Sequence, residues 1–416
     1  MYIIKKPDVD EIQINLPFSK SITHRIYILS AFNLGTTRII DALESYDTNL
    51  TRGVLTNLGA HFEINEKEIL SKYPIGKVKD SDCFLGNSGS SARFLPPVAT
   101  FVDKKIHFHG ENRLHDRPFS ELIKALQSLG AEIDSNNSSL PFDVHPQPLK
   151  GGEIKFSSLP SSQIVTGLMM AALWMENDLT MQLPDITPSL PYIKMTYKLM
   201  KNLGLQLEIN QNEIFVKSGK PDINWNFNVE KDMSAASYWV IFSLINGIKV
   251  RLSGVNLPSL QGDEKIFEIA EMLGAKVMLY SDRIEIEGEM KNGMNLNCRD
   301  IPDLVPALSI LGLFAPEPII LSDIKHLEYK ESNRVEAIRN NINTMCGKTE
   351  YENNNLKIIP QKSYKGGTIN TFNDHRIAMS FAVAGTRISD VFIDNPACVQ
   401  KSYPDFWNDF TFWERI

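Results

Sequence analysis

Apolar and polar positions along the chain recur in two alternating kinds of segment. The first is an amphipathic helical pattern that ends in Leu-Gly and runs into strand-like alternation, as in "MKNLGLQLEINQNEIFVKS". A glycine there suits a helix C-terminus with positive φ, and the alternation about a turn predicts a β-hairpin. The pattern repeats every 70 to 74 residues, with "MCG" replacing Leu-Gly in the last copy, at Gly59, Gly130, Gly204, Gly274 and Gly347.

The second segment is a hydroxyl-rich or acidic helix start followed by a strongly apolar stretch, such as "SSQIVTGLMMAALW". Helices that are apolar on nearly every face are buried inside a domain. Six such starts keep the same spacing as the hairpins, near Ser21, Ser90, Ser162, Ser234, Asp303 and Asp374. The chain therefore consists of six similar α/β repeats.

Six helix starts accompany only five Leu-Gly hairpins, so we expect the sixth hairpin at the N-terminus. There "YIIKK", the turn "PDVD" and the strand "EIQINLP" would pair, with the last helix "PDFWNDFTFWERI" leading onto them. A chain of 416 residues exceeds one hydrophobic core. Three repeats per domain give one continuous inserted domain, 19–229, and one discontinuous domain, 1–18 plus 230–416, which carries both termini.

Composition narrows the class of protein. The chain is 43% hydrophobic and 22% charged, and its net charge of -7 argues against a general nucleic-acid binder. The longest apolar run, residues 164–175, is too short to cross a bilayer, and we expect no signal peptide because the start, "MYIIKKPDVDEIQINLP", alternates like a strand and lacks a long apolar core. The four scattered cysteines indicate reduced thiols. We expect a cytoplasmic protein with no membrane partner, and no G-x-G-x-x-G or G-K-[ST] motif supports NAD or ATP.

Cations cluster near several of the six helix starts. A helix N-terminus presents unpaired N–H groups and partial positive charge, which favour anions. For a single helix the polar residues are more simply N-caps, and a single cation is more simply a surface charge. Their joint placement predicts a shared site for phosphate and carboxylate, formed by Lys20, Arg25, Arg93, Arg117, Lys330, Arg334, Arg376 and Lys401.

Three carboxylates accompany these cations. Asp303 and Glu331 lie in "DIPDLVP" and "YKESNR", and Asp374 lies in "NDHR". A carboxylate among fixed cations can be held in one protonation state and serve as a proton donor or acceptor. We expect Asp374 to be structural.

At these positions the chain resembles the 5-enolpyruvylshikimate-3-phosphate (EPSP) synthase family. The segments "SKSITHR", "LGNSGSSAR" and "RLHDRP" are similar to the family's first three motifs. The segments "SSQ", "SLPY", "SLQGD", "YKESNR", "NDHRIAM" and "VQKSYPDF" follow in the family's order. No single motif is decisive, but the ordered set covers the whole chain.

The resemblance implies the enolpyruvyl transferase fold: two inverse α/β domains, each of three βαβαββ repeats around buried parallel helices, with the active site in the cleft between them. It implies transfer of the enolpyruvyl group of phosphoenolpyruvate to the 5-hydroxyl of shikimate 3-phosphate. No metal or organic cofactor is expected. We expect these two small molecules as the only partners, and a monomer.

The family's functional residues carry over to matching positions. For shikimate 3-phosphate they are Lys20, Ser21, Arg25, Ser161, Ser162, Gln163, Ser189, Tyr192, Asp303 and Lys330. For phosphoenolpyruvate they are Lys20, Gly89, Arg117, Gln163, Arg334, Arg376 and Lys401. The resemblance implies that Asp303 removes the proton of the 5-hydroxyl and that Glu331 protonates the methylene carbon. Lys20 or Lys401 would assist.

Four residues depart from the family pattern: Phe18, Leu190, Glu328 and Asn333. Glu328 adds negative charge beside an anion site, which bears on affinity more than on reaction type. One alternative is the sister enzyme that transfers enolpyruvyl to UDP-N-acetylglucosamine, but its loop cysteine is missing from "HGENRLHDRPFSEL". Another is a non-catalytic descendant that binds phosphorylated metabolites. RNA 3'-terminal phosphate cyclases share the repeat but need a nucleotide site and a basic surface.

Overall fold

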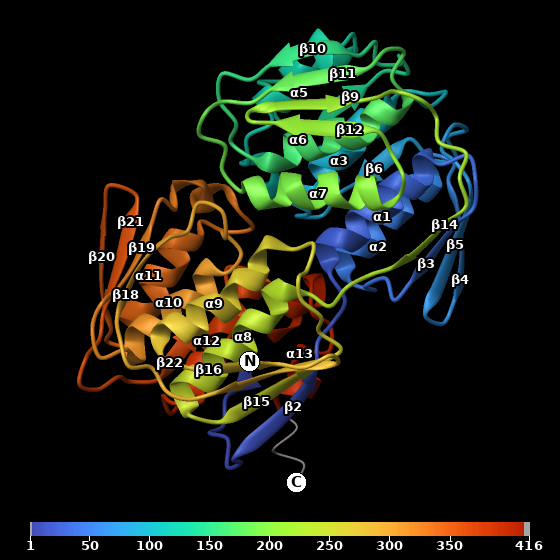
Figure 1. Cartoon of the computed structure of the whole chain (residues 1–416). Coiled ribbons are helices and arrows are strands. Elements are labelled where there is room, and N and C mark those ends of the chain that lie inside the picture. The colour runs from blue at the N-terminus through green and yellow to red at the C-terminus, as the bar shows by residue number, and fades with distance from the viewer. Residues whose placement is uncertain (1, 412–416) are drawn as a thin grey trace. The chain divides into compact units, whose positions relative to one another are not determined.

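The computed structural model describes residues 2–411 and divides into two compact units (Figure 1). The continuous unit is Phe18–Glu230. The discontinuous unit contains Met1–Pro17 and Lys231–Ile416, of which residues 2–17 and 231–411 are described.

The continuous unit contains three four-stranded sheets with the same topology. Each sheet joins a parallel strand pair to an antiparallel hairpin, in the orders β14-β3-β5-β4, β6-β7-β9-β8 and β10-β11-β13-β12. The strands are β3 (Thr37–Ile40), β4 (His61–Asn65), β5 (Glu68–Tyr73), β6 (Asp82–Phe84), β7 (Ile106–His109), β8 (Ile133–Ser135), β9 (Phe142–Val144), β10 (Gly152–Lys155), β11 (Leu179–Gln182), β12 (Leu207–Asn210), β13 (Glu213–Val216) and β14 (Trp225–Asn228).

Helices of two kinds connect these strands. The first kind is buried along nearly its whole length: α1 (Lys20–Phe32), α3 (Gly89–Ala99) and α6 (Ser162–Ala171). These three pack on one another, and a Cβ at Gly167 of α6 would lie 2.5 Å from the Arg93 carbonyl oxygen of α3. The second kind is amphipathic: α2 (Tyr46–Asn57), α5 (Ser120–Ser128) and α7 (Leu190–Asn202). A short α4 (Asn112–His115) precedes α5.

The discontinuous unit repeats this plan around three buried helices, α8 (Met233–Asn246), α10 (Val305–Phe314) and α12 (His375–Gly385). Its outer helices are α9 (Lys265–Leu273), α11 (Arg334–Thr344) and α13 (Phe406–Phe410). The sheets have the orders β16-β17-β15-β2, β18-β19-β21-β20 and β1-β23-β22. Their strands are β1 (Tyr2–Ile3), β2 (Glu11–Asn15), β15 (Lys249–Ser253), β16 (Lys276–Leu279), β17 (Arg283–Glu287), β18 (Met294–Asn297), β19 (Ile319–Ser322), β20 (Lys348–Glu352), β21 (Asn355–Ile359), β22 (Gly367–Ile369) and β23 (Val391–Ile393).

The predicted N-terminal hairpin is wrong. Strand β1 pairs antiparallel with β23, whereas β2 pairs parallel with β15 in a different sheet. The alternation of β2 buries Ile12 and Ile14 in the core that α8 shares. Its apolar face is therefore used by its own sheet, and β1 alone occupies the hairpin position of the third sheet. The end of the predicted last helix, residues 412–416, lies outside the described residues.

The five predicted Leu-Gly hairpins are confirmed as antiparallel strand pairs. Four marker glycines end a helix with positive φ, from +81° at Gly204 to +110° at Gly59. The fifth position is different because Cys346, with φ 59°, takes the left-handed conformation instead of Gly347. A Cβ at Gly347 would lie 2.5 Å from Ile342, so close packing explains this glycine.

All four cysteines are free thiols, as predicted. Burial is the main cause that raises the pKa of Cys83, Cys298 and Cys398 to about 12. Among the described residues, none of the helices has the length and apolar character needed to cross a membrane.

Candidate functional site

The start of α1 carries the first cations of the predicted site. Ser19 caps the helix by accepting a hydrogen bond from the Ile22 backbone N–H. Lys20 follows at once and forms an ion pair of 3.3 Å with Asp47 of α2. Both side chains are buried, although each carries a charge. The structure therefore holds the Lys20 ammonium group at a fixed place beside the helix start.

Arg25 lies one turn further along α1 and is almost fully buried. Its Nε donates to Thr196 Oγ1 at 2.8 Å, and its terminal nitrogens donate to the carbonyl oxygens of Ser21 and Tyr192. Burial is the main cause that lowers the pKa of Arg25 to about 10. These bonds join α1 to α7. Three residues that are predicted to bind shikimate 3-phosphate therefore lie together: Ser21, Arg25 and Tyr192.

Gly89 and Arg117 are in direct contact at the start of α3. A Cβ built on Gly89 would lie 2.3 Å from one terminal nitrogen of Arg117. Arg117 is only 4% exposed, so its guanidinium group packs against the glycine backbone. Ser88 caps the same helix start through the Ser91 N–H. The absence of a side chain at residue 89 is what admits the guanidinium group.

We expect Gly89→Ala to displace the Arg117 guanidinium group while the fold is kept, because only the end of a flexible side chain must move. Steady-state kinetics should show kcat/KM for phosphoenolpyruvate reduced on the order of 10²-fold. The KM for shikimate 3-phosphate should change little. Gly53→Ala is the control, since a Cβ there meets nothing within 4 Å. Equal losses toward both substrates would show that Gly89 serves the fold and not one ligand.

Gln163 connects the starts of α3 and α6. Its Nε2 donates to Ser90 Oγ at 3.1 Å, and its Oε1 accepts from Ser161 Oγ. Arg93 reaches the same Oε1 at 3.5 Å, donates to the Gly89 and Pro118 carbonyl oxygens, and stacks over the Phe119 ring. Arg93 thus braces the segment that contains Arg117.

The other predicted residues of the continuous unit lie at helix starts. Ser161 caps α6, and Ser162 is its first residue. Ser189 precedes α7 in the left-handed conformation, with φ 60°, and makes no side-chain cap bond. Tyr192 lies in the first turn of α7. A strained, buried serine that does not cap its helix is suited to bind a ligand.

Arg334 is the centre of the site in the discontinuous unit. Its Nε donates to Asp374 at 2.9 Å, one terminal nitrogen to Asp303 at 2.9 Å, and the other to Glu331 at 2.7 Å. Burial disfavours its charge, but the three carboxylates outweigh burial and raise the pKa of Arg334 above its ordinary value. A guanidinium group has five N–H donors. In the described residues these bonds use three of them, so two remain for a ligand.

Asp303 is shared by two arginines. Arg376 donates to its second oxygen at 2.7 Å while Arg334 holds the first. Burial alone would raise the pKa of Asp303, but the charges of Arg376 and Arg334 outweigh it and hold the pKa far below its usual range. Asp303 was expected near a helix start as one of six equivalent residues. It precedes α10 and does not cap it, since Leu304 occupies the cap position.

The remaining predicted residues of this unit lie around the two arginines. Lys330 is close enough to Asp303 to lower its pKa. Lys401 is buried at the end of a short 3₁₀ segment, Pro396–Lys401, that packs against α12. Its grouping with Arg334 and Arg376 remains a prediction. Asp374 has the expected structural role because it caps α12 through the Arg376 N–H.

Two buried residues of this cluster were not predicted. Tyr238 of α8 accepts a hydrogen bond of 3.4 Å from Arg376, and burial raises its pKa to about 12. Asp263 accepts a hydrogen bond from Ser234 Oγ, one turn before Tyr238. Tyr238 is the one tyrosine of α8, a helix that is buried along nearly its whole length, and this was the available signal for it.

Burial, followed by the charge of Asp303, raises the pKa of Asp263 to about 7, while Ser234 and Arg376 oppose the shift and Asp232 adds to it. A raised pKa means that the folded protein binds this proton more tightly. The resulting stability is complete below about pH 4, the unfolded value, and is lost as pH rises through about 7. We expect Asp263→Asn to remove this loss. Urea unfolding between pH 5 and 8 should then show stability that falls less with pH than in the parent chain. Parallel pH dependences would contradict the assignment.

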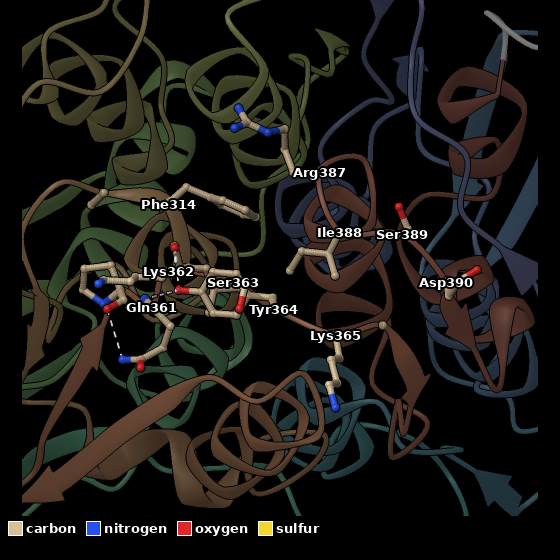
Figure 2. Close-up of a pocket in the computed structure, with 14 residues that line it drawn as sticks. Phe314, Gln361, Lys362, Ser363, Tyr364, Lys365, Arg387, Ile388, Ser389 and Asp390 are labelled. Carbon is tan, nitrogen blue, oxygen red and sulfur yellow. Dashed lines mark hydrogen bonds between the residues drawn. The ribbon is translucent and has the colours of Figure 1, made fainter.

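A cavity of about 770 Å³ lies elsewhere in the discontinuous unit (Figure 2). It is lined by the end of α10, the segment 360–366 and residues 387–390, and contains none of the predicted residues. Figure 2 shows the charged ends of Lys365 and Arg387 pointing to opposite sides. Cations that diverge do not form one anion site. The ion-pair cluster around Arg334 therefore remains the better candidate.

Known proteins match the chain along almost its entire length. A family model described as EPSP synthase (3-phosphoshikimate 1-carboxyvinyltransferase) matches residues 5–410. The 3-phosphoshikimate 1-carboxyvinyltransferase of Marinomonas sp. (strain MWYL1) is 31% identical, over 96% of each chain. The chain belongs to the EPSP synthase family. The enzyme of the same name from Haemophilus influenzae is 32% identical, over 95% of each chain.

A solved EPSP synthase from Acinetobacter baumannii has the same fold. It superimposes with a TM-score of 0.81 at 24% identity and covers 98% of this chain and 96% of its own. The predicted fold class, an enolpyruvyl transferase fold of α/β type, is confirmed.

Two departures from the EPSP synthase pattern have structural explanations. Glu328 accepts a hydrogen bond of 3.1 Å from the Tyr351 hydroxyl on β20. Asn333 caps α11 by accepting from the Glu336 N–H, as an aspartate would. Leu190 is the first residue of α7 and is half-buried, as is Phe18. None of the four replaces a residue of the Arg334 cluster.

Proposed function

We propose that the residues assembled in the two units carry out the reaction of the EPSP synthase family. The enolpyruvyl group of phosphoenolpyruvate passes to the 5-hydroxyl of shikimate 3-phosphate, and phosphate is released. This reaction belongs to the shikimate pathway, which leads to chorismate and the aromatic amino acids. The observation that carries the proposal is the Arg334 cluster, in which Arg334 and Arg376 each donate to one oxygen of Asp303 and keep this carboxylate ionised.

Shikimate 3-phosphate carries one carboxylate and one phosphate. Both suit the cationic and hydroxyl side chains at the starts of α1, α6 and α7. Arg25 supplies a buried cation there, and Ser161, Ser162 and Ser189 supply hydroxyls. We assign this substrate to Lys20, Ser21, Arg25, Ser161, Ser162, Gln163, Ser189, Tyr192, Asp303 and Lys330.

Phosphoenolpyruvate has a carboxylate next to a phosphate, so it needs two clusters of donors. The planar donors of arginine suit both groups. The Gly89–Arg117 contact and Lys20 offer one cluster, and Arg334 with Arg376 offers the other. We assign this substrate to Lys20, Gly89, Arg117, Gln163, Arg334, Arg376 and Lys401.

The chemistry has two steps. In the first, Asp303 takes the proton of the 5-hydroxyl while that oxygen bonds to C2 of phosphoenolpyruvate. Glu331 protonates C3, assisted by Lys20 or Lys401, and a tetrahedral intermediate results. In the second, the C2–O bond to phosphate breaks, phosphate leaves with the bonding electron pair, and C3 returns a proton to the Glu331 carboxylate, which leaves the enol ether. Fixed guanidinium groups stabilise the developing charge without fresh reorganisation of solvent.

Asp303 is suited to its role because its ionisation depends on two arginines. A carboxylate held by both is a weak base. When an anionic substrate shares Arg334 and Arg376, their hold on Asp303 weakens and its basicity rises. Arrival of phosphoenolpyruvate would thus activate the base.

The residues of the two units must act on the same pair of substrates, as the predicted interdomain site requires. We therefore expect the molecule to become more compact when shikimate 3-phosphate and a phosphoenolpyruvate mimic are added together. Closure would exclude water from the reacting groups. Small-angle scattering that shows no change would count against this part of the proposal. We also propose a cytoplasmic monomer.

The decisive experiment measures phosphate release from phosphoenolpyruvate. We expect release only when shikimate 3-phosphate is also present, and in Lys20→Met a much lower rate of release with a raised KM for phosphoenolpyruvate. Turnover with UDP-N-acetylglucosamine instead would assign the sister reaction. Binding of both substrates without turnover would indicate a non-catalytic descendant.

A further inference from the structure

Helix α2 buries three polar residues, of which Asp47 and Thr51 lie one helical turn apart. Residues four apart lie on the same face of a helix. Neither residue is needed to cap α2, because Ser45 and Thr48 form a reciprocal capping box. A charged and a hydroxyl side chain buried on one face must therefore serve contacts with neighbouring helices.

Both residues reach α1 at positions that are also one turn apart. Asp47 pairs with Lys20 at 3.3 Å, and Thr51 Oγ1 lies 2.8 Å from His24 Nδ1. A third contact between α2 and α1 follows along the helices, since Arg52 donates to the Tyr27 hydroxyl at 3.2 Å. Three polar contacts in register fix α2 against α1 both along and around its axis.

Thr51 also reaches α3. Its Oγ1 lies 2.7 Å from Ser91 Oγ, which lies 2.7 Å from Ser88 Oγ. Ser88 caps α3 and directly precedes Gly89, where Arg117 packs. The hydroxyl of Thr51 thus joins His24 on α1 to the start of α3. These four hydrogen-bonded side chains are fully buried, so water cannot replace a lost bond: His24, Thr51, Ser91 and Ser88.

We propose that Asp47 and Thr51 are positioning residues for phosphoenolpyruvate: Asp47 orients Lys20, and Thr51 sets the start of α3 relative to α1. The two residues act through others and touch no substrate. The inference rests on the proposed function, because it takes Lys20 and the Gly89–Arg117 contact as the phosphoenolpyruvate residues of this unit.

The test compares Asp47→Asn, Thr51→Val and Thr51→Ser with the parent chain in steady-state kinetics. Thr51→Val keeps the side-chain shape and removes the shared hydroxyl, whereas Thr51→Ser restores it. We expect Asp47→Asn and Thr51→Val each to raise KM for phosphoenolpyruvate about tenfold, a loss typical of one buried hydrogen bond whose partner is left unsatisfied. KM for shikimate 3-phosphate should change less than about twofold, and Thr51→Ser should resemble the parent chain.

The matched control is Thr100→Val, at the other end of α3. Thr100 is fully buried and donates to the Pro97 carbonyl oxygen at 2.8 Å. The Thr100→Val variant should be less stable than the parent chain, without a change in KM for phosphoenolpyruvate. If Thr51→Val and Thr100→Val behave alike in KM, or if Thr51→Ser fails to rescue, Thr51 is structural and the inference is wrong.

Lys20→Met separates this failure from failure of the proposed function. If Lys20→Met raises KM for phosphoenolpyruvate while Asp47→Asn and Thr51→Val do not, only the inference falls. If Lys20→Met also leaves that KM unchanged, the assignment of Lys20 itself falls, and the inference falls with it.

Discussion

Replacing Asp303 by alanine is expected to lower kcat by about 10²- to 10⁴-fold, the usual contribution of general acid–base catalysis. Each oxygen of the Asp303 carboxylate forms an ion pair with one arginine, and the carboxylate is the proposed acceptor of the 5-hydroxyl proton. Its removal frees donors of Arg334 and Arg376, so binding of phosphoenolpyruvate should not weaken. Stopped-flow or steady-state release of phosphate measures the loss of turnover.

The catalytic assignment depends on a comparison of turnover with binding. Calorimetric titration of Asp303→Ala with shikimate 3-phosphate should show a far smaller change in affinity than in kcat. Asp303→Asn provides the matched variant, since it keeps the shape and cannot accept the proton as a carboxylate. Comparable losses of turnover and affinity would make Asp303 a binding residue only.

The repeats explain why so much of the fold could be predicted. Alternation after each Leu-Gly marker is a local property, and five hairpins formed where it occurs. The prediction of an N-terminal hairpin was wrong because the pattern of apolar and polar residues there is equally compatible with two separate strands. Only the partners β15 and β23, both distant in sequence, decide between these pairings.

The six helix starts show a second limit of sequence reasoning. Five of them are capped by their own side chains, as the simpler explanation proposed: Ser19, Ser88, Ser161, Asp232 and Asp374. Each cap satisfies part of the N–H groups that a ligand would otherwise find. Side-chain cations therefore contribute more of the positive potential than the helix ends alone.

Contacts between segments that are distant along the chain could not be predicted from the sequence. Nothing near "YDTN" indicates that Asp47 pairs with Lys20, because the pairing depends on how α1 and α2 pack. The same holds for Arg93 and Gln163, which are 70 residues apart in sequence. The resemblance supplied residue types for the site, whereas packing decides which of them touch.

Arg334→Gln is the substitution from which we expect the largest loss of stability. Arg334 is 1% exposed and is the shared partner of three carboxylates, of which Asp374 is fully buried. Removing one member of a buried ion pair costs about 3–5 kcal/mol, because the remaining charge stays desolvated. Glutamine cannot supply the lost charge, so the pKa of Asp303, which Arg334 helps to lower, should rise.

A pH series and a control on the same helix test this explanation. The stability deficit should be greatest near neutral pH and should shrink as pH falls, because protonation removes the uncompensated negative charges. Arg339→Gln also breaks an ion pair on α11, with Glu336 at 2.6 Å, but both side chains are only half-buried. Its cost should stay below about 1 kcal/mol. Urea unfolding in which the two variants lose equal stability, or in which the Arg334→Gln deficit is independent of pH, would show that the cluster does not depend on its buried charge.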